Sequence, residues 1–407
     1  MGLIIYIRYI YIYMQFSNNT KSHIKHFVGY MGACKLNLSN TSQRTQRRLL
    51  SKLYINIKDA YNREINYNKV LVPVHNIHQL PKLPESVFMP NHIKKYIHQN
   101  TLYYLRYNSI IIGRKVEVNF YICSERDISK YDSYIKQMFT WLYMLNMYAS
   151  SECAETLKVD IYMTPFKKKL PDNPLVVLDS DNINSAYTTV CTKNAEIVIF
   201  RAEEWFKVFI HETFHCFGLD FGTMDLCIIN KKLKQLFPIN SKFNLYEAYT
   251  EVWAEIINCV FVSFNSLKDK SDKETFLLYC EFGLQLERIF SLYQCDKVLK
   301  YMGITYKQLL ETNQSDIYKE NTNVFSYYVV VAILMNDYIG FINWCNKNNL
   351  AFFQFTKTLK NLNGFLELIK NNYKSKKLLE ALDCVLQKRR MSKLIVTTTR
   401  MSLVELP

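Results

Sequence analysis

The sequence predicts an α+β protein in which a small mixed sheet is followed by a mainly helical C-terminal part. Short β-branched or alternating segments occur between residues 110 and 200, and from 272 to 388 the apolar residues recur at helical spacing. Hydrophobic residues make up 49% of the 407 residues, and only 10 Gly and 9 Pro are present. This composition is typical of a well-packed globular protein, and the length allows more than one domain.

Residues 1–107 are predicted to form an N-terminal extension and accessory region. Residues 3–16 are β-branched and aromatic, but this apolar stretch contains Arg8 and is too short for a membrane-spanning helix. It also lacks the basic start and the small-residue cleavage site of a signal peptide. We therefore expect a strand or an extension here, and no membrane partner.

The predicted sheet occupies the first part of a domain that we expect over residues 108–270. Strands are expected over residues 110–112, 116–123, 157–163 and 195–200, with residues 175–178 as a candidate for a further short strand. Helical periodicity over residues 128–148 predicts a long helix between the second and third strands. Residues 184–189 are polar and extended, and they fit equally an ordinary polar loop or an edge strand that would pair with extended substrate backbone.

A helix predicted over Ala202–Phe217 contains the pattern H-E-x-x-H, formed by His211, Glu212 and His215. No Pro or Gly interrupts the helix, and Gly218 follows as a stop signal. Residues four apart on a helix lie on the same face, so the two imidazoles can hold one metal ion between them. Glu212 lies one step round the helix, where its carboxylate can reach a water molecule on that ion.

A second helix is predicted over Asn244–Phe264. Glu247, Glu251 and Glu255 are spaced by four residues, so they form one acidic stripe on an otherwise apolar helix. Three like charges stacked in this way repel one another, which favours a cation beside them. A metal ion held by the two histidines would be such a cation.

Two neutral imidazoles and one carboxylate make a three-ligand zinc site with an open position for water. Zinc lowers the pKa of that water to about 7, so Glu212 can act as a general base and the hydroxide can attack a peptide carbonyl. On these motifs the chain resembles the zincin metallopeptidases, and within them the gluzincin branch, whose third ligand is a Glu on a later helix. The resemblance implies a zinc-dependent peptidase with Zn²⁺ as its cofactor and a protein or peptide as its substrate.

The resemblance leaves two registers open for the third ligand. Glu251-Val-Trp-Ala-Glu255 resembles the gluzincin pattern E-x-x-A-[DE], which would make Glu251 the ligand and Glu255 the partner that braces a zinc histidine. Glu247-Ala-Tyr-Thr-Glu251 fits the alternative pattern E-A-x-x-[DE], which would make Glu247 the ligand. We favour Glu251, because it is central in the stripe and has a role in both registers.

Two related zinc patterns match less well. Phe221 stands where the metzincin pattern requires a third histidine, and Gly222 to Asp225 resembles the aspzincin pattern G-T-x-D with Asp225 as ligand. Asp225 follows His215 by only ten residues, a short distance for the chain to turn back. A hydrogen-bond donor to the transition state is also expected near the zinc. The candidates for this donor are Tyr246, Tyr249, Tyr327 and Tyr328.

The net charge of +15 raises an alternative function, a catalytically inactive zincin-like protein that binds nucleic acid through a basic surface. The Lys and Arg residues are scattered and no nucleic-acid-binding signature accompanies them, so a solvated surface is favoured and no such partner is expected.

The 11 cysteines are odd in number and widely spaced, which predicts reduced thiols in a cytoplasmic protein, or in host cytoplasm or a virion for a viral chain. Residues 271–390 are predicted to form a helical lobe, and residues 391–407 a loose tail. The sequence indicates no oligomeric state.

Overall fold

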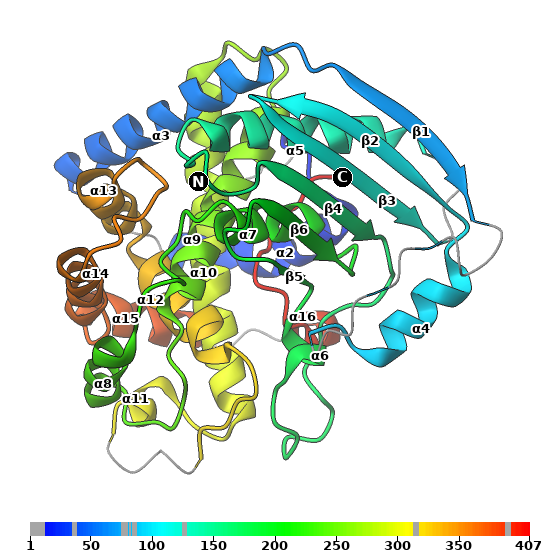
Figure 1. Ribbon diagram of the computed structural model, residues 1–407. Helices are drawn as coiled ribbons and strands as arrows, with labels where there is room; N and C mark the ends of the chain where they lie inside the picture. Colours follow the sequence, from blue (N-terminus) through cyan, green and yellow to red (C-terminus); the bar gives the residue numbers. More distant parts are fainter. Residues whose placement is uncertain are drawn as a thin grey trace. The chain divides into compact units, whose positions relative to one another are not determined.

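The computed structural model describes residues 13–34, 39–74, 80, 83, 88–123, 128–311, 317–386 and 392–407 (Figure 1). Residues 3–12 of the apolar N-terminal stretch therefore lie outside the described residues. The chain divides into two compact units. The sheet unit comprises residues 56–169 and 179–220, and the helical unit comprises residues 1–55, 170–178 and 221–407. These units do not follow the expected boundaries, because residues 56–107 group with the sheet and 221–270 with the helices.

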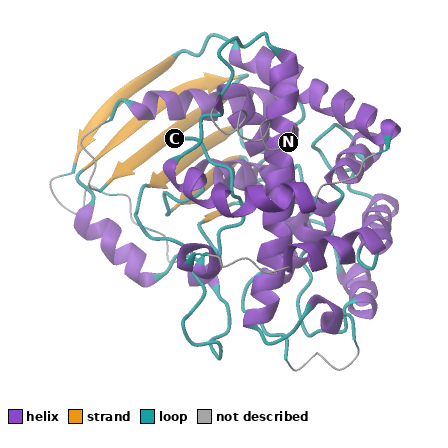
Figure 2. Cartoon of the chain, turned by 180° about the vertical axis from the view of Figure 1, so that it is seen from behind, coloured by secondary structure: helices purple, strands orange, loops and turns teal. Residues whose placement is uncertain are grey.

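The sheet unit is built on a six-stranded mixed sheet in the order β1-β2-β3-β4-β6-β5, drawn in orange in Figure 2. The strands are β1 (Tyr67–Pro73), β2 (Tyr103–Ile111), β3 (Arg114–Ile122), β4 (Thr156–Tyr162), β5 (Ala186–Thr188) and β6 (Asn194–Ile199). Strand β4 runs parallel to β3 and β6, and the other neighbours are antiparallel. The α+β class predicted from the sequence is confirmed, and β1 is a strand that the sequence analysis did not predict.

The two faces of the sheet are covered by different helices. On one face Phe120 of β3 packs against Tyr131 of α5 (Lys130–Asn146) and Trp205 of α7 (Trp205–Cys216). On the other face Tyr121 and its neighbours form a buried cluster with α4 (Asn91–Asn100). Successive residues of a strand point to opposite faces of the sheet, so the adjacent side chains of Phe120 and Tyr121 lie on different faces.

The helical unit contains the helices that were predicted between residues 272 and 388. Its helices are α2 (Asn18–Ala33), α8 (Cys227–Leu236), α9 (Leu245–Asn265), α10 (Lys273–Tyr301), α11 (Tyr306–Leu309), the π-helix η2 (Phe325–Val330), α12 (Val331–Asn336), α13 (Tyr338–Asn348), α14 (Leu359–Asn372), α15 (Lys376–Leu386) and α16 (Lys393–Thr397). Helix α3 (Asn40–Tyr61) joins this unit to the other. Helices α9 and α10 pack against each other and against η2 and α12.

The expectation of a loose C-terminal tail is wrong for the residues that follow α16. Residues 398–404 are buried, and the carboxylate of Glu287 on α10 accepts hydrogen bonds from the backbone N–H of Leu403 (2.8 Å) and Val404 (2.7 Å). Asn258 on α9 donates to the carbonyl of Val404 at 2.7 Å. Polar side chains hold this segment, and apolar periodicity in a sequence carries no signal for such contacts.

The expectation of reduced thiols is also wrong for four cysteines. Disulfides join Cys34 to Cys384 in the helical unit and Cys153 to Cys191 in the sheet unit. The partners are 350 and 38 residues apart, so the pairing depends on the fold and could not be deduced from spacing.

Within the described ranges, no single helix is long and apolar enough to cross a membrane. The segments Phe325–Asn336 and Tyr338–Asn348 meet the length and composition criteria only as a pair, and that pair is bent by 90°.

Candidate metal centre

Helix α7, which contains the H-E-x-x-H pattern, ends at a position that requires glycine. Gly218 has a left-handed backbone (φ 65°), and the N–H of Leu219 bonds to the carbonyl of Phe214, closing the last turn. A Cβ atom at Gly218 would lie 3.1 Å from the sulfur of Cys153 and 3.2 Å from that of Cys191. The stop predicted at Gly218 is therefore confirmed, and the helix end packs directly on the disulfide.

The start of α7 is fixed by a buried ion pair. The Lys168 ammonium lies 2.8 Å from the Glu204 carboxylate, and both side chains are 1% exposed. Burial lowers the pKa of Lys168, and the charge of Glu204 opposes that shift. The backbone N–H of Lys168 also donates to Glu203 at 2.9 Å. Glu203 and Glu204 lie just before the helix, which begins at Trp205.

The rotation of α7 about its axis is set by contacts with α5. The indole N–H of Trp141 donates to the hydroxyl of Thr213 at 2.8 Å, and that hydroxyl donates to the carbonyl of Ile210 at 2.6 Å. The Trp141 ring also stacks on Phe214. Because Thr213 lies about 200° round the helix from His211, these contacts hold the histidine face away from α5.

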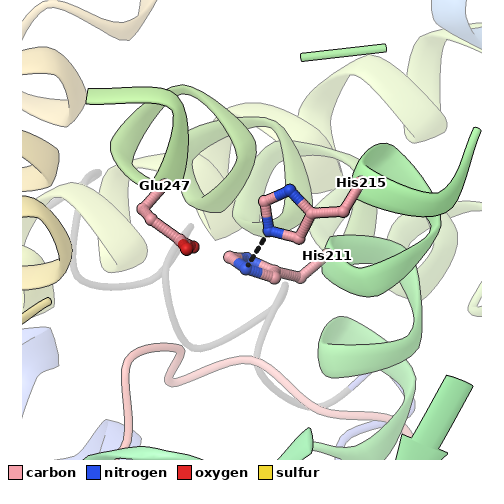
Figure 3. A group of neighbouring side chains, drawn as sticks. All are labelled: His211, His215 and Glu247. Atoms are coloured by element: carbon pink, nitrogen blue, oxygen red, sulfur yellow. Dashed lines mark hydrogen bonds between the residues drawn. The ribbon is translucent and has the colours of Figure 1, made fainter. Parts of the chain in front are cut away.

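His211 and His215 lie one turn apart on α7, and their Nε2 atoms are 3.1 Å apart (Figure 3). Both side chains are buried. Two ring nitrogens at this distance need a proton or a cation between them, because their lone pairs would otherwise repel. One tetrahedral zinc ion with bonds of about 2.0–2.1 Å would hold two nitrogens roughly 3.3 Å apart. The pair therefore has the spacing that a shared ion requires.

The tautomer of His215 is set by Asp220, a residue that the sequence analysis missed. The Nδ1–H of His215 donates to the Asp220 carboxylate, which is 1% exposed. With the proton on Nδ1, the lone pair lies on Nε2, the atom that faces His211. Carboxylates commonly hold zinc-binding histidines in this way. The available signal was an acidic residue two positions after the glycine that ends the helix.

The acidic stripe lies on α9 as predicted, and its three carboxylates are buried. Glu247 has two hydrogen-bond donors from the segment around η2. Its Oε1 accepts from the amide of Asn323 at 3.1 Å, and its Oε2 accepts from the hydroxyl of Tyr327 at 2.8 Å.

Among the described residues, His211, His215 and Glu247 form a group that could hold a metal ion. Each offers one ligand atom, and these atoms lie within 4.8 Å of one another (Figure 3). This group does not include Glu251, the ligand that the sequence favoured, or Glu255. It does include Glu247, the ligand in the alternative register. Members of the stripe lie about 6 Å apart along the helix axis, so one ion cannot bind all three equally.

The rival zinc patterns find no support in the positions of their residues. Asp225 is exposed and accepts a hydrogen bond from the N–H of Cys227 at the start of α8. Phe221 is fully buried in an aromatic cluster with Phe355 and Phe365.

Two of the four tyrosines considered as transition-state donors are buried in the core and bond to backbone carbonyls instead. The hydroxyl of Tyr249 donates to the carbonyl of Phe353 at 2.7 Å, and that of Tyr328 donates to the carbonyl of Thr399. Tyr327 contacts Glu247 instead, and Tyr246 is half-buried with its ring edge-on to Phe221.

Comparisons with known proteins leave the function open. No known protein family matches this sequence. No solved structure matches the chain. An uncharacterized protein of Acanthamoeba polyphaga mimivirus is 28% identical over 190 residues, which is 43% of this chain and 46% of that protein. The match therefore spans less than half of that relative, and its name carries no activity.

Proposed function

We propose that this protein is a zinc-dependent peptidase in which His211, His215 and Glu247 hold the metal and Glu212 is the general base. The observation that carries the proposal is the grouping of two imidazoles, one helical turn apart, with a carboxylate, all ligand atoms within 4.8 Å. Two neutral nitrogens and one carboxylate oxygen are the donor set of catalytic zinc sites that keep a position for water. In this register Glu251, one turn further along α9, would be the residue that braces a zinc-binding histidine.

The chemistry divides between the ion and the protein side chains. Bound zinc would supply a water molecule with a pKa of about 7 and a positive charge to polarise the substrate carbonyl. Glu212 would serve as the general base that accepts a proton from this water and as the group that returns it to the leaving amine. Asp220 keeps the lone pair of His215 on Nε2, so the imidazole stays in its ligating form.

The edge of the sheet supports a peptide as the substrate. Strand β5 is one of the two edge strands of the sheet and runs antiparallel to β6. Ser185 and Thr189 bond to β6 through the Ser185 carbonyl and the Thr189 N–H, so the backbone groups of Ala186 and Thr188 point to the open edge. An extended substrate segment can add there as a further strand. The backbone N–H of Cys191 bonds to the carbonyl of His215, so the segment that follows β5 is tied to α7.

The test combines metal analysis with peptide cleavage by the full-length protein. Wild type should bind one equivalent of zinc and cleave members of a peptide library. Glu212→Gln should keep the zinc and lose about 10²- to 10⁴-fold in kcat/KM, because only the proton acceptor changes. His215→Ala should lose the zinc itself.

Asp225→Asn is the matched control, since it neutralises an exposed carboxylate outside the group. It should behave as wild type in both measurements. Wild-type protein that binds no zinc, or a Glu212→Gln variant with full activity, would overturn the proposal.

A further inference from the structure

The carboxylate of Glu247 is held from two sides within the helical unit. Asn323 and Tyr327 are four residues apart, one at the approach to η2 and one inside it. One donates to Oε1 and the other to Oε2, so both oxygens of the carboxylate accept a hydrogen bond from the segment around η2.

The orientation of the Asn323 amide is itself fixed. Its Oδ1 accepts from the side-chain amide of Asn244 at 2.7 Å, so its NH₂ group must point toward Glu247. Asn244 is the residue just before α9, and its carbonyl accepts from the hydroxyl of Ser326 at 2.9 Å. The start of α9 and the start of η2 are thus bonded to each other around Glu247.

The start of η2 is anchored by a second, half-buried carboxylate. Glu320 accepts from the backbone N–H of Phe325 at 2.6 Å and from the hydroxyl of Tyr318 at 2.9 Å. Desolvation raises the pKa of Glu320, opposed by hydrogen bonds led by that from Ser241. A π-helical turn is rare, and such turns are frequent at functional sites. Here that turn contains Tyr327.

We propose that Asn323 and Tyr327 are positioning residues that hold the Glu247 carboxylate ready for the metal ion, an inference that rests on the proposed zinc site. A free Glu side chain has several rotamers and loses their entropy when it binds a metal. With both oxygens already hydrogen-bonded, Glu247 has lost that freedom before the metal arrives. The clamp, which we define as Asn323 and Tyr327, therefore raises metal affinity without touching the metal.

The test is the zinc dissociation constant of the full-length protein, measured by competition with a chromophoric chelator. Tyr327→Phe removes one hydroxyl, and Asn323→Ala removes the amide. Each should raise the dissociation constant about 10- to 100-fold, the usual effect of losing a partner of a metal ligand. The visible absorption bands of the cobalt-substituted protein should also change, because the Glu247 ligand changes its orientation.

Tyr328→Phe is the matched control. It removes the hydroxyl of the neighbouring tyrosine, which bonds to the carbonyl of Thr399 and not to Glu247. It should lower the unfolding temperature of the metal-free protein while leaving the zinc dissociation constant and the cobalt spectrum unchanged.

The outcomes separate the clamp from the proposed function. If wild type binds zinc and Tyr327→Phe binds it equally well, the clamp is refuted and the zinc site stands. If Tyr327→Phe and Tyr328→Phe weaken binding equally, the effect is one of stability and the clamp is again refuted. If wild type binds no zinc, the proposed function and the clamp both fail.

Discussion

Replacement of Asp220 by asparagine should weaken metal binding while keeping the shape of the site. The Asp220 carboxylate accepts the Nδ1–H of His215 and is almost fully buried, so the two groups see little solvent. An asparagine can present either its oxygen or its NH₂ group to Nδ1. If the NH₂ group donates, the proton must move to Nε2, and the imidazole can no longer bind the ion through that atom.

The size of the effect follows from the role of the carboxylate. Loss of such a partner typically costs 10- to 100-fold in metal affinity, or about 1.4–2.7 kcal/mol. Asp220→Ala should add a stability loss of about 1–3 kcal/mol in the metal-free protein, because it leaves a buried N–H without an acceptor. Competition with a chromophoric chelator measures the first quantity and denaturant unfolding the second.

Asp225→Asn is again the appropriate control, because its carboxylate is exposed and accepts a hydrogen bond from the start of α8. It should change neither quantity by more than about 0.5 kcal/mol. If both Asp220→Asn and Asp220→Ala bound zinc as tightly as wild type, Asp220 would not set the tautomer of His215, and the assignment of Nε2 as its ligand atom would be wrong.

Two further predictions concern stability. Burial raises the pKa of Glu287 from 4.5 to about 7, so the folded state binds this proton more tightly than the unfolded state does. The free energy of unfolding should therefore fall by up to roughly 3 kcal/mol as the pH rises from 4.5 through 7. Urea titrations at several pH values measure this profile, and Glu287→Gln should flatten it. The Cys153–Cys191 disulfide closes a loop of 38 residues, so replacing both cysteines by serine should lower the free energy of unfolding by roughly 3–4 kcal/mol in urea titrations without reductant.

The parts of the site that the sequence predicted are those set by local periodicity. The spacing of His211 and His215 fixes their common face once the segment is helical, and Gly218 marks the end of that helix. The edge strand that was one of two interpretations of residues 184–189 is found at Ala186–Thr188. Each of these features depends on residues a few positions apart, so one sequence was sufficient.

The choice between Glu247 and Glu251 could not be made from the sequence. Both lie on the same stripe of α9, so periodicity treats them alike. Glu247 differs through Asn323 and Tyr327, which are 76 and 80 residues away and belong to another helical segment. Asp220 was missed for a similar reason, because its bond to His215 is made by the turn after α7 and not by the helix itself.

The bond between Thr20 and Leu403 also constrains how the helical unit is made. The hydroxyl of Thr20 on α2 donates to the carbonyl of Leu403 at 3.0 Å, across 383 residues. Contacts of such separation slow folding, because the intervening chain must first be ordered. During synthesis α2 leaves the ribosome early; Phe27 can pack on Phe290 once α10 has emerged, but the bond of Thr20 must wait for Leu403. The last contact of α2 is therefore made only when almost the whole chain has been synthesised.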